Sequence, residues 1–290
     1  MLFVPEIETF IYYLESRSKF HKSHSEKLRQ NIIESTLNKF VFNIDYINCL
    51  EQNIDENHPL RDDCNLFIKM LIDNDKIGLN ADINLNTNDS EIIFEKLSKL
   101  FFQDEILIGI SEKHENINNE SIILNVKNVS SVNKNYIYSK LLTNEVCQIR
   151  HTDIENNSDI IPLLNCTYEL HKEFEEVVII DRQTNLNHNL YNLLIEKEVK
   201  FKYYTLNADL TDALIVKNKL KKYHIFNTNN TDLIHERIVI IKNLIITLDE
   251  DPFNIEHRNT WLITIQLCSN STNKILSEKC DKFIPTLFRN

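Results

Sequence analysis

Residues 238–241 constrain the fold most, because four β-branched residues in a row favour a buried strand. A charged triplet, residues 235–237, stands directly before this run, and two residues after it a second apolar run begins, residues 244–248. Two strands that are joined through two residues make a β-hairpin. The sequence therefore predicts a hairpin whose first strand carries charged side chains at its start.

The hairpin belongs to a longer α/β pattern in the C-terminal half of the chain. Residues 177–180 form a continuous apolar run that ends at Asp181, which is typical of a strand buried on both faces. Leucines at helical spacing follow, and residues 199–203 then alternate between apolar residues and lysines as a second strand. A strand, a helix and a strand within about 30 residues make a βαβ crossover, in which the two strands are parallel. An α/β domain with a mixed sheet is predicted over residues 160–290.

Further elements complete this domain. Residues 223–226 and 260–267 are predicted as strands, and a last helix is predicted from about residue 271.

The N-terminal part, residues 1–155, is predicted to be a helix-rich α+β domain that serves as an interaction domain. Apolar residues at helical spacing follow Pro5, which suits a proline in a first helical turn. Ser23 and Glu26 form a capping box before a second helical stripe. Ser90 is placed to cap a later helix.

The period of the sequence changes after this helical region. Residues 105–110 and 121–126 are predicted as strands that are separated by a polar loop. Residues 135–146 fit either a helix or a strand. The polar residues 156–159 carry no periodicity, and they are the predicted linker between the two domains.

The composition limits the functions that the chain can have. With 290 residues there is room for two domains of ordinary size or for one large domain. A net charge of -11 argues against a basic surface along the whole chain, although a local basic patch is compatible with it. Only 2 glycines occur, which excludes a Gly-rich phosphate loop for ATP or a dinucleotide. We expect no cofactor and no metal.

The cysteines and the termini bear on the compartment. The 6 cysteines include no Cys-x-x-Cys pair, which favours buried free thiols in a reducing cytosol. The N-terminus lacks the basic start of a signal peptide, and no apolar run reaches the roughly 20 residues that a membrane span needs. A cytoplasmic, soluble protein is predicted. The abundance of Asn, Ile and Lys indicates an AT-rich coding sequence, such as that of a low-GC bacterium.

From residue 169 to residue 267 the chain resembles a degenerate phospholipase D-like module, as found at the C-terminus of MIT-domain proteins and in bacterial relatives. The resemblance lies in a strand that ends at Asp181, a helix, a Lys-rich strand and the residues Ile-His-Glu-Arg at 234–237. In the bacterial relatives this last motif reads approximately Ile-His-(Asp/Asn/Glu)-Arg. The resemblance implies a phospholipase D-like α/β fold and points toward binding.

A working enzyme of the phospholipase D type carries two His-x-Lys motifs, each followed four residues later by Asp. The chain departs from this pattern. One His would attack phosphorus, the other would protonate the leaving oxygen, and the lysines would stabilise the developing charge. Here Arg237 replaces the Lys, Lys242 stands in the place of the Asp, and no second motif occurs in a comparable context. His235 and Arg237 are therefore candidates for binding a phosphate or carboxylate, with catalysis by them the weaker expectation. The alternative is a buried structural pair with Asp181 or Glu236.

Two further interpretations stay open. A metal-dependent nuclease would use Asp181, Glu198 and Lys200, although a helix separates the strands that carry them. A nucleic-acid-binding protein would use a lysine patch, for which a solvated surface is the simpler explanation. The candidate residues of this patch are Lys200, Lys202, Lys219, Lys221 and Lys222.

The function predicted from these observations is a non-catalytic binding or adaptor subunit of a larger prokaryotic assembly, such as an anti-phage or anti-plasmid defence complex. Its partners would be other protein subunits, with nucleic acid as a further partner through the lysine patch. The alternatives are a nuclease or phosphodiesterase that uses His235 or the metal site, and a direct nucleic-acid-binding protein.

Overall fold

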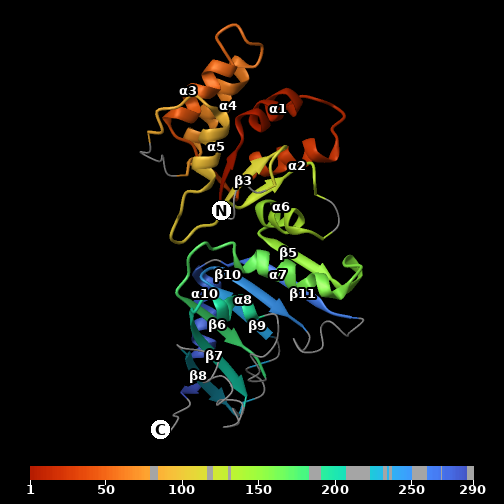
Figure 1. The fold of residues 1–290 in the computed structure, drawn as a ribbon, viewed down its shortest axis with the longest axis vertical. Helices are drawn as coiled ribbons and strands as arrows, with labels where there is room; N and C mark the ends of the chain where they lie inside the picture. Colours follow the sequence, from red (N-terminus) through yellow and green to blue (C-terminus); the bar gives the residue numbers. More distant parts are fainter. Residues whose placement is uncertain are drawn as a thin grey trace. The chain divides into compact units, whose positions relative to one another are not determined.

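The computed structural model describes residues 1–78, 84–115, 120–129, 132–182, 191–206, 223–230, 234, 237–249, 260–268 and 270–285. The chain divides into two compact units, Met1–Glu145 and Val146–Asn290. Each unit is built of helices and a sheet, so the α/β class predicted from the sequence is confirmed (Figure 1).

The described strands of the first unit form a parallel sheet. They are β1 (Leu2–Pro5), β2 (Lys39–Phe40), β3 (Leu107–Ser111) and β4 (Ile123–Asn125). Their order is β2-β1-β3-β4, and each neighbouring pair is parallel. Two of them, β1 and β2, are absent from the sequence prediction, because runs of two to four residues are too short to display a period of two.

Helices connect and cover these strands. They are α1 (Ile7–Arg17), α2 (His24–Ile33), α3 (Ile44–Asn53), α4 (Arg61–Asp73), α5 (Ser90–Ser98) and α6 (Lys134–Asn144). The α5 helix packs on β1 and β3, and it approaches closely because Gly109 has no side chain. A Cβ added at Gly109 would lie only 3.0 Å from the Phe94 ring.

Three helix termini in this unit can be compared with the prediction. The capping box before α2 is confirmed, since the Ser23 side chain accepts from the Glu26 amide and the Glu26 carboxylate accepts from the Ser23 amide. The cap of α5 is Asp89, whose side chain accepts from the amides of the first turn, and Ser90 is already helical. The ambiguous residues 135–146 are mostly helix α6, which ends at Glu145 in a left-handed conformation (φ 58°).

The described strands of the second unit form a mixed sheet of order β12-β8-β7-β6-β9-β10-β11-β5. Their bounds are β5 (Val146–Arg150), β6 (Glu176–Ile180), β7 (Lys200–Leu206), β8 (Tyr223–Thr228), β9 (Arg237–Ile241), β10 (Leu244–Leu248), β11 (Leu262–Leu267) and β12 (Ile284–Pro285). The β6, β7 and β8 strands are parallel, which confirms the predicted βαβ crossover. The β9 and β10 strands pair antiparallel across a two-residue turn, which confirms the hairpin.

The boundary between the units lies earlier than the predicted boundary at residues 155–160. The β5 strand pairs antiparallel with β11, with Arg150 opposite Leu262, so residues 146–150 belong to the second sheet. Three of the four residues of the predicted linker at 156–159 form a short 3₁₀ helix (Asn157–Asp159) that leads into α7 (Ile160–Tyr168). The sequence prediction missed β5 because this strand follows helix α6 after only one residue, so the change from helix to strand is not visible in the spacing of the apolar residues.

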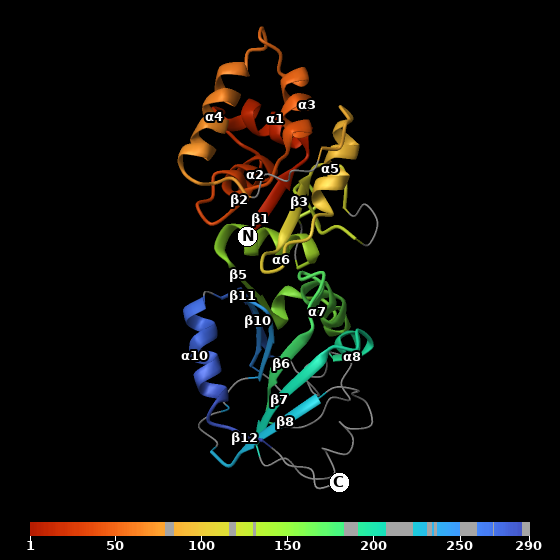
Figure 2. The same cartoon turned by 90° about the vertical axis from the view of Figure 1, so that its left-hand side faces the viewer.

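Helices cover the two faces of the second sheet. Figure 2 shows α10 (Asn270–Cys280) on one side of the sheet, and α7 and α8 (Asn192–Glu196) on the other. An apolar cluster lies between α10 and the sheet. In it, the strand register places Ile180 of β6 between Tyr204 of β7 and Ile238 of β9. Side chains alternate between the faces of a sheet. The residues that follow Ile180 and precede Ile238 therefore point away from α10.

No helix in the described parts of the chain combines the length and the apolar character that a membrane crossing requires.

Candidate functional site

The candidate site of the second unit lies where β6 ends and β9 begins. These strands are antiparallel neighbours with Ile180 opposite Ile238, so one further step along the ladder brings Asp181 opposite Arg237. Arg237 Nε lies 3.3 Å from Asp181 Oδ1. The Asp181 side chain is only 1% exposed and that of Arg237 only 13%. The structure thus contains the buried pair that the sequence offered as the alternative to an anion site.

The main chain around this ion pair is also fixed. The Asp181 amide donates to the Tyr204 carbonyl oxygen at 2.9 Å and thereby continues the pairing of β6 with β7. Arg182 Nε donates to the Ile234 carbonyl oxygen at 2.9 Å, which ties the end of β6 to the residue before the predicted His-x-Arg motif. Two arginines and one aspartate therefore gather at this edge of the sheet.

Several predicted site residues lie outside the described residues. They are His235, Glu236, Lys219, Lys221 and Lys222. Lys242, which stands in the place of a catalytic Asp, lies in the turn between β9 and β10, at the far end of β9 from Arg237.

Lys200 and Lys202 of the predicted lysine patch are engaged in ion pairs. Lys202 Nζ lies 2.7 Å and Lys200 Nζ 3.1 Å from the two carboxylate oxygens of Glu176. Partial burial alone would raise the pKa of Glu176, but the hydrogen bonds from Lys202 and Lys200 outweigh this, and its pKa lies below the ordinary value. The two lysines thus share one carboxylate on the strand next to their own.

The alternative metal site at Asp181, Glu198 and Lys200 is wrong. The β6 and β7 strands are parallel with Glu176 opposite Lys200, so Lys200 lies at the amino end of the pair and Asp181 at the carboxyl end. At a rise of about 3.3 Å per residue, these two positions are separated by roughly 16 Å. Glu198 precedes β7 in a left-handed conformation (φ 53°), also at the amino end.

A second polar cluster, which the sequence prediction missed, lies at the carboxyl edge of the first sheet. Glu6 directly follows β1, and its side chain is 3% exposed. The Ser111 hydroxyl donates to Glu6 Oε2 at 2.7 Å and itself accepts from the amides of Lys113 and His114. His114 Nε2 lies 3.5 Å from Glu6 Oε1. These contacts join the segments that follow the neighbouring parallel strands β1 and β3.

An ion-pair network lies beside this cluster. Glu112 follows β3, and its buried carboxylate pairs with Arg29 from α2, whose side chain is 4% exposed. The other carboxylate oxygen of Glu112 lies 2.6 Å from Lys127 Nζ. The position is the one where ligands of open α/β sheets bind, since the strand order reverses between β1 and β3. Here the protein's own charges neutralise one another at that edge.

The sequence carried only a faint signal for this cluster. Glu6 follows an apolar run of four residues, and Glu112 follows an apolar strand that ends in Ser111. Ser111 and Glu6 are separated by 105 residues, and only the parallel pairing of β1 with β3 brings them together. Among the described residues, no three His, Cys, Asp or Glu side chains lie close enough to hold a metal ion.

Comparison with known proteins yields distant structural likenesses. No protein-family model and no curated protein matches the chain. It is similar to Nuc, a phospholipase D family member from Salmonella typhimurium, with 10% identity over 49% of this chain and 98% of that chain, at a TM-score of 0.36. NucT from Helicobacter pylori has 9% identity over 49% of this chain and 98% of its own, at a TM-score of 0.35.

A third likeness is to TrmBL2, an archaeal chromatin protein for which a novel mode of DNA binding is described. Identity is 14% over 49% of this chain, and the TM-score is 0.31. The match spans about half of the chromatin protein, 54% of its length. Likenesses at this level assign neither a family nor an activity to the chain.

Proposed function

We propose that this protein is a non-catalytic binding or adaptor subunit of a larger assembly, and that its second unit is a degenerate phospholipase D-like domain. The observation that carries the proposal is the buried ion pair between Arg237 and Asp181. A cation that stabilises charge in phosphoryl transfer must face the phosphate. Arg237 instead faces a carboxylate, whose negative charge would repel a phosphate at the same place.

The described lysines of the predicted patch agree with this proposal. Lys200 and Lys202 are partly neutralised by Glu176, so they offer a phosphate backbone less net positive charge than two free lysines would. This weighs against the alternative of a direct nucleic-acid-binding protein through these two residues.

The first unit exposes apolar side chains that suit a protein partner. Leu66 is 62% exposed and Met70 39%, and both lie on the same face of α4 because they are four residues apart. Ile72, at 58% exposure, lies on the same helix. Neighbouring apolar side chains that remain in contact with water are typical of interaction surfaces. We therefore place the protein partner on α4.

The wider role remains the one predicted from the sequence. A prokaryotic defence assembly against phage or plasmids is the context that the composition and the phospholipase D-like resemblance favour. Genomic neighbours that encode other defence components would support it.

An activity assay tests the absence of catalysis. The purified full chain is incubated with bis(p-nitrophenyl) phosphate and with single- and double-stranded DNA. The proposal expects no turnover that depends on His235. Cleavage that is lost in His235→Ala but kept in His224→Ala, a matched change at an exposed histidine of β8, would show an enzyme instead.

Partner capture tests the adaptor role. The tagged full chain is purified from its native host, and stoichiometric partners are identified by mass spectrometry. Leu66→Asp should abolish retention of the partner, whereas Asn65→Asp, an equal charge change at an exposed position of the same helix, should preserve it. Equal retention by both variants would remove α4 from the proposal.

A further inference from the structure

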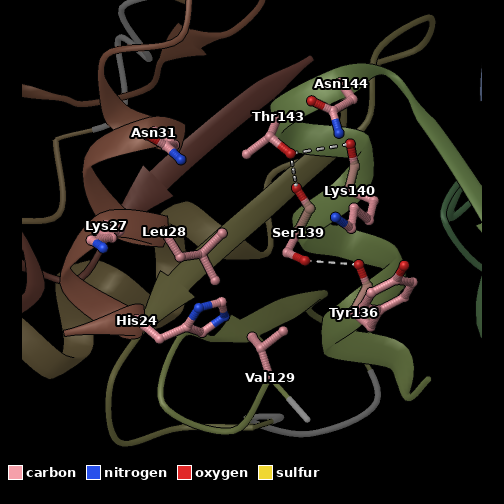
Figure 3. Close-up of a pocket in the computed structure, with 10 residues that line it drawn as sticks. All are labelled: His24, Lys27, Leu28, Asn31, Val129, Tyr136, Ser139, Lys140, Thr143 and Asn144. Atoms are coloured by element: carbon pink, nitrogen blue, oxygen red, sulfur yellow. Dashed lines mark hydrogen bonds between the residues drawn. The ribbon is translucent and has the colours of Figure 1, made fainter. Parts of the chain in front are cut away.

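A cavity of about 510 Å³ lies between α2 and α6 of the first unit, and none of the residues discussed above as a site lines it. Figure 3 shows the two helices as its facing walls. His24, Lys27, Leu28 and Asn31 line it from α2, at the spacing of one helix face, and Lys140 and Asn144 are among the residues that line it from α6. Its size falls within the range of small-molecule sites in proteins.

The charges around this cavity have one sign. Lys27 lines it from α2 and Lys140 from α6, and none of the described lining residues carries a carboxylate. Lys140 Nζ lies 5.3 Å from the centre of the Tyr136 ring, a cation–π contact that leaves its N–H groups able to donate. On a chain with a net charge of -11, such a place is a local positive site.

The hydrogen-bonding groups of the lining also favour an anion. The hydroxyls of Ser139 and Thr143 donate to carbonyl oxygens within α6, so their protons are already used. The lining also holds the amide groups of Asn31 and Asn144, the His24 ring, the Tyr136 hydroxyl and the two ammonium groups. Charge-assisted bonds from such donors to phosphate oxygens are among the stronger hydrogen bonds in proteins.

Part of the lining is apolar. Leu28 points from α2 toward α6, and Val129 lies at the base of the cavity in Figure 3. A ligand that satisfies both parts carries an anionic group for the lysines and an uncharged ring or chain for Leu28 and Val129. We propose that this cavity binds a small phosphate ester of nucleotide size. The proposal concerns the first unit alone and does not depend on the absence of catalysis in the second.

Calorimetric titration of the full chain tests the proposal. AMP, ADP and ATP are the ligands, and adenosine is the uncharged comparison. Binding of at least one nucleotide is expected, with affinity that falls as salt is added, and binding of adenosine is expected to be much weaker. Lys27→Ala and Lys140→Ala should each weaken nucleotide binding about tenfold, which is the usual size of the loss of one charged hydrogen bond.

Two variants serve as controls. Lys69→Ala removes one positive charge from an exposed position on α4, and it should bind nucleotide like the wild type. Leu28→Trp adds bulk to the cavity without a change of charge, and it should abolish binding while the circular dichroism spectrum stays unchanged.

Three results would overturn the proposal. One is the absence of binding for all three nucleotides at millimolar concentration. Another is equal binding by the wild type and by the Lys27→Ala/Lys140→Ala double variant. The third is binding of a single-stranded oligonucleotide through the same two lysines when no mononucleotide binds, which would assign the cavity to a nucleic-acid strand. Phosphodiesterase activity of the second unit would leave all three results unaffected.

Discussion

At the scale of single residues, the second unit is organised by one buried pair of opposite charges. Asp181 and Arg237 end and begin neighbouring strands, and both are largely removed from water. A buried charge is costly unless it is paired. Removal of either partner should therefore destabilise the protein, because it leaves the other charge buried and unpaired.

Asp181→Asn tests this account. The variant keeps the shape of the side chain and removes its charge, so Arg237 becomes an unpaired buried cation, and the free energy of unfolding should fall by about 3 kcal/mol. Urea denaturation of the purified protein measures it. The double variant Asp181→Asn/Arg237→Met should lose less than the sum of the two single variants. Strictly additive losses would show that the two side chains do not interact.

The same residues show what the sequence could predict of this site. Asp181 and Arg237 were recognisable because each flanks a continuous apolar run, and their pairing was one of two alternatives that the sequence left open. The choice between these alternatives depends on the antiparallel register of β6 and β9, which places the Asp181 carboxylate opposite Arg237. This register cannot be read from the sequence. Glu6 and Ser111 were not recognisable, because a parallel pairing between segments 105 residues apart has no local signature.

At the scale of secondary-structure elements, the termini of the helices are specified by individual side chains. The capping box of α2 satisfies two amides that the helix itself leaves without partners. Hydrogen bonds from Lys19 and from Ser23 lower the pKa of Glu26 to about 2. A carboxylate whose pKa is depressed in the folded state contributes stability above its unfolded pKa and loses that contribution as the pH falls.

Because the pKa of Glu26 is lowered in the folded state, the effect of Glu26→Gln on stability should depend on pH. Wild type should be more stable than the variant at pH 7, and the difference should shrink as the pH falls from about 4.5, the ordinary value, to about 2, the folded value. Thermal unfolding at a series of pH values measures it. A difference that stays constant over this range would mean that the Glu26 charge does not contribute to the cap.

Helix α6 ends in a way that most residues disfavour. Glu145 adopts a left-handed conformation, and a negative charge at the carboxyl end of a helix opposes the helix dipole. Glu145→Gly should therefore raise the free energy of unfolding by roughly 1 kcal/mol. Glu145→Ala, which removes the charge but keeps the Cβ, should gain less. Equal gains would assign the whole effect to charge.

At the scale of the whole molecule, some strand pairings could be predicted from the sequence and others could not. The β6–β7 crossover and the β9–β10 hairpin were predicted because their strands are continuous runs joined by short or helical connections. The β5 strand was missed because it follows helix α6 after only one residue, and because its partner β11, more than 100 residues further along the chain, gives no local signal. The predicted domain boundary therefore lies later in the chain than the division at residues 145 and 146, among residues that already belong to the second unit.

Two fragment pairs test the boundary that the structure defines. Each unit has its own sheet and its own buried residues, so fragments 1–145 and 146–290 should each fold cooperatively. A division at the predicted boundary, into 1–155 and 156–290, removes β5 from its place beside β11. The β11 strand would then present an unpaired edge, which promotes association between chains. Size-exclusion chromatography and urea unfolding should show a monomeric, stable fragment 146–290 and an aggregating or destabilised fragment 156–290. Equal behaviour of the two fragments would mean that β5 contributes little to the second unit and that its edge is protected in another way.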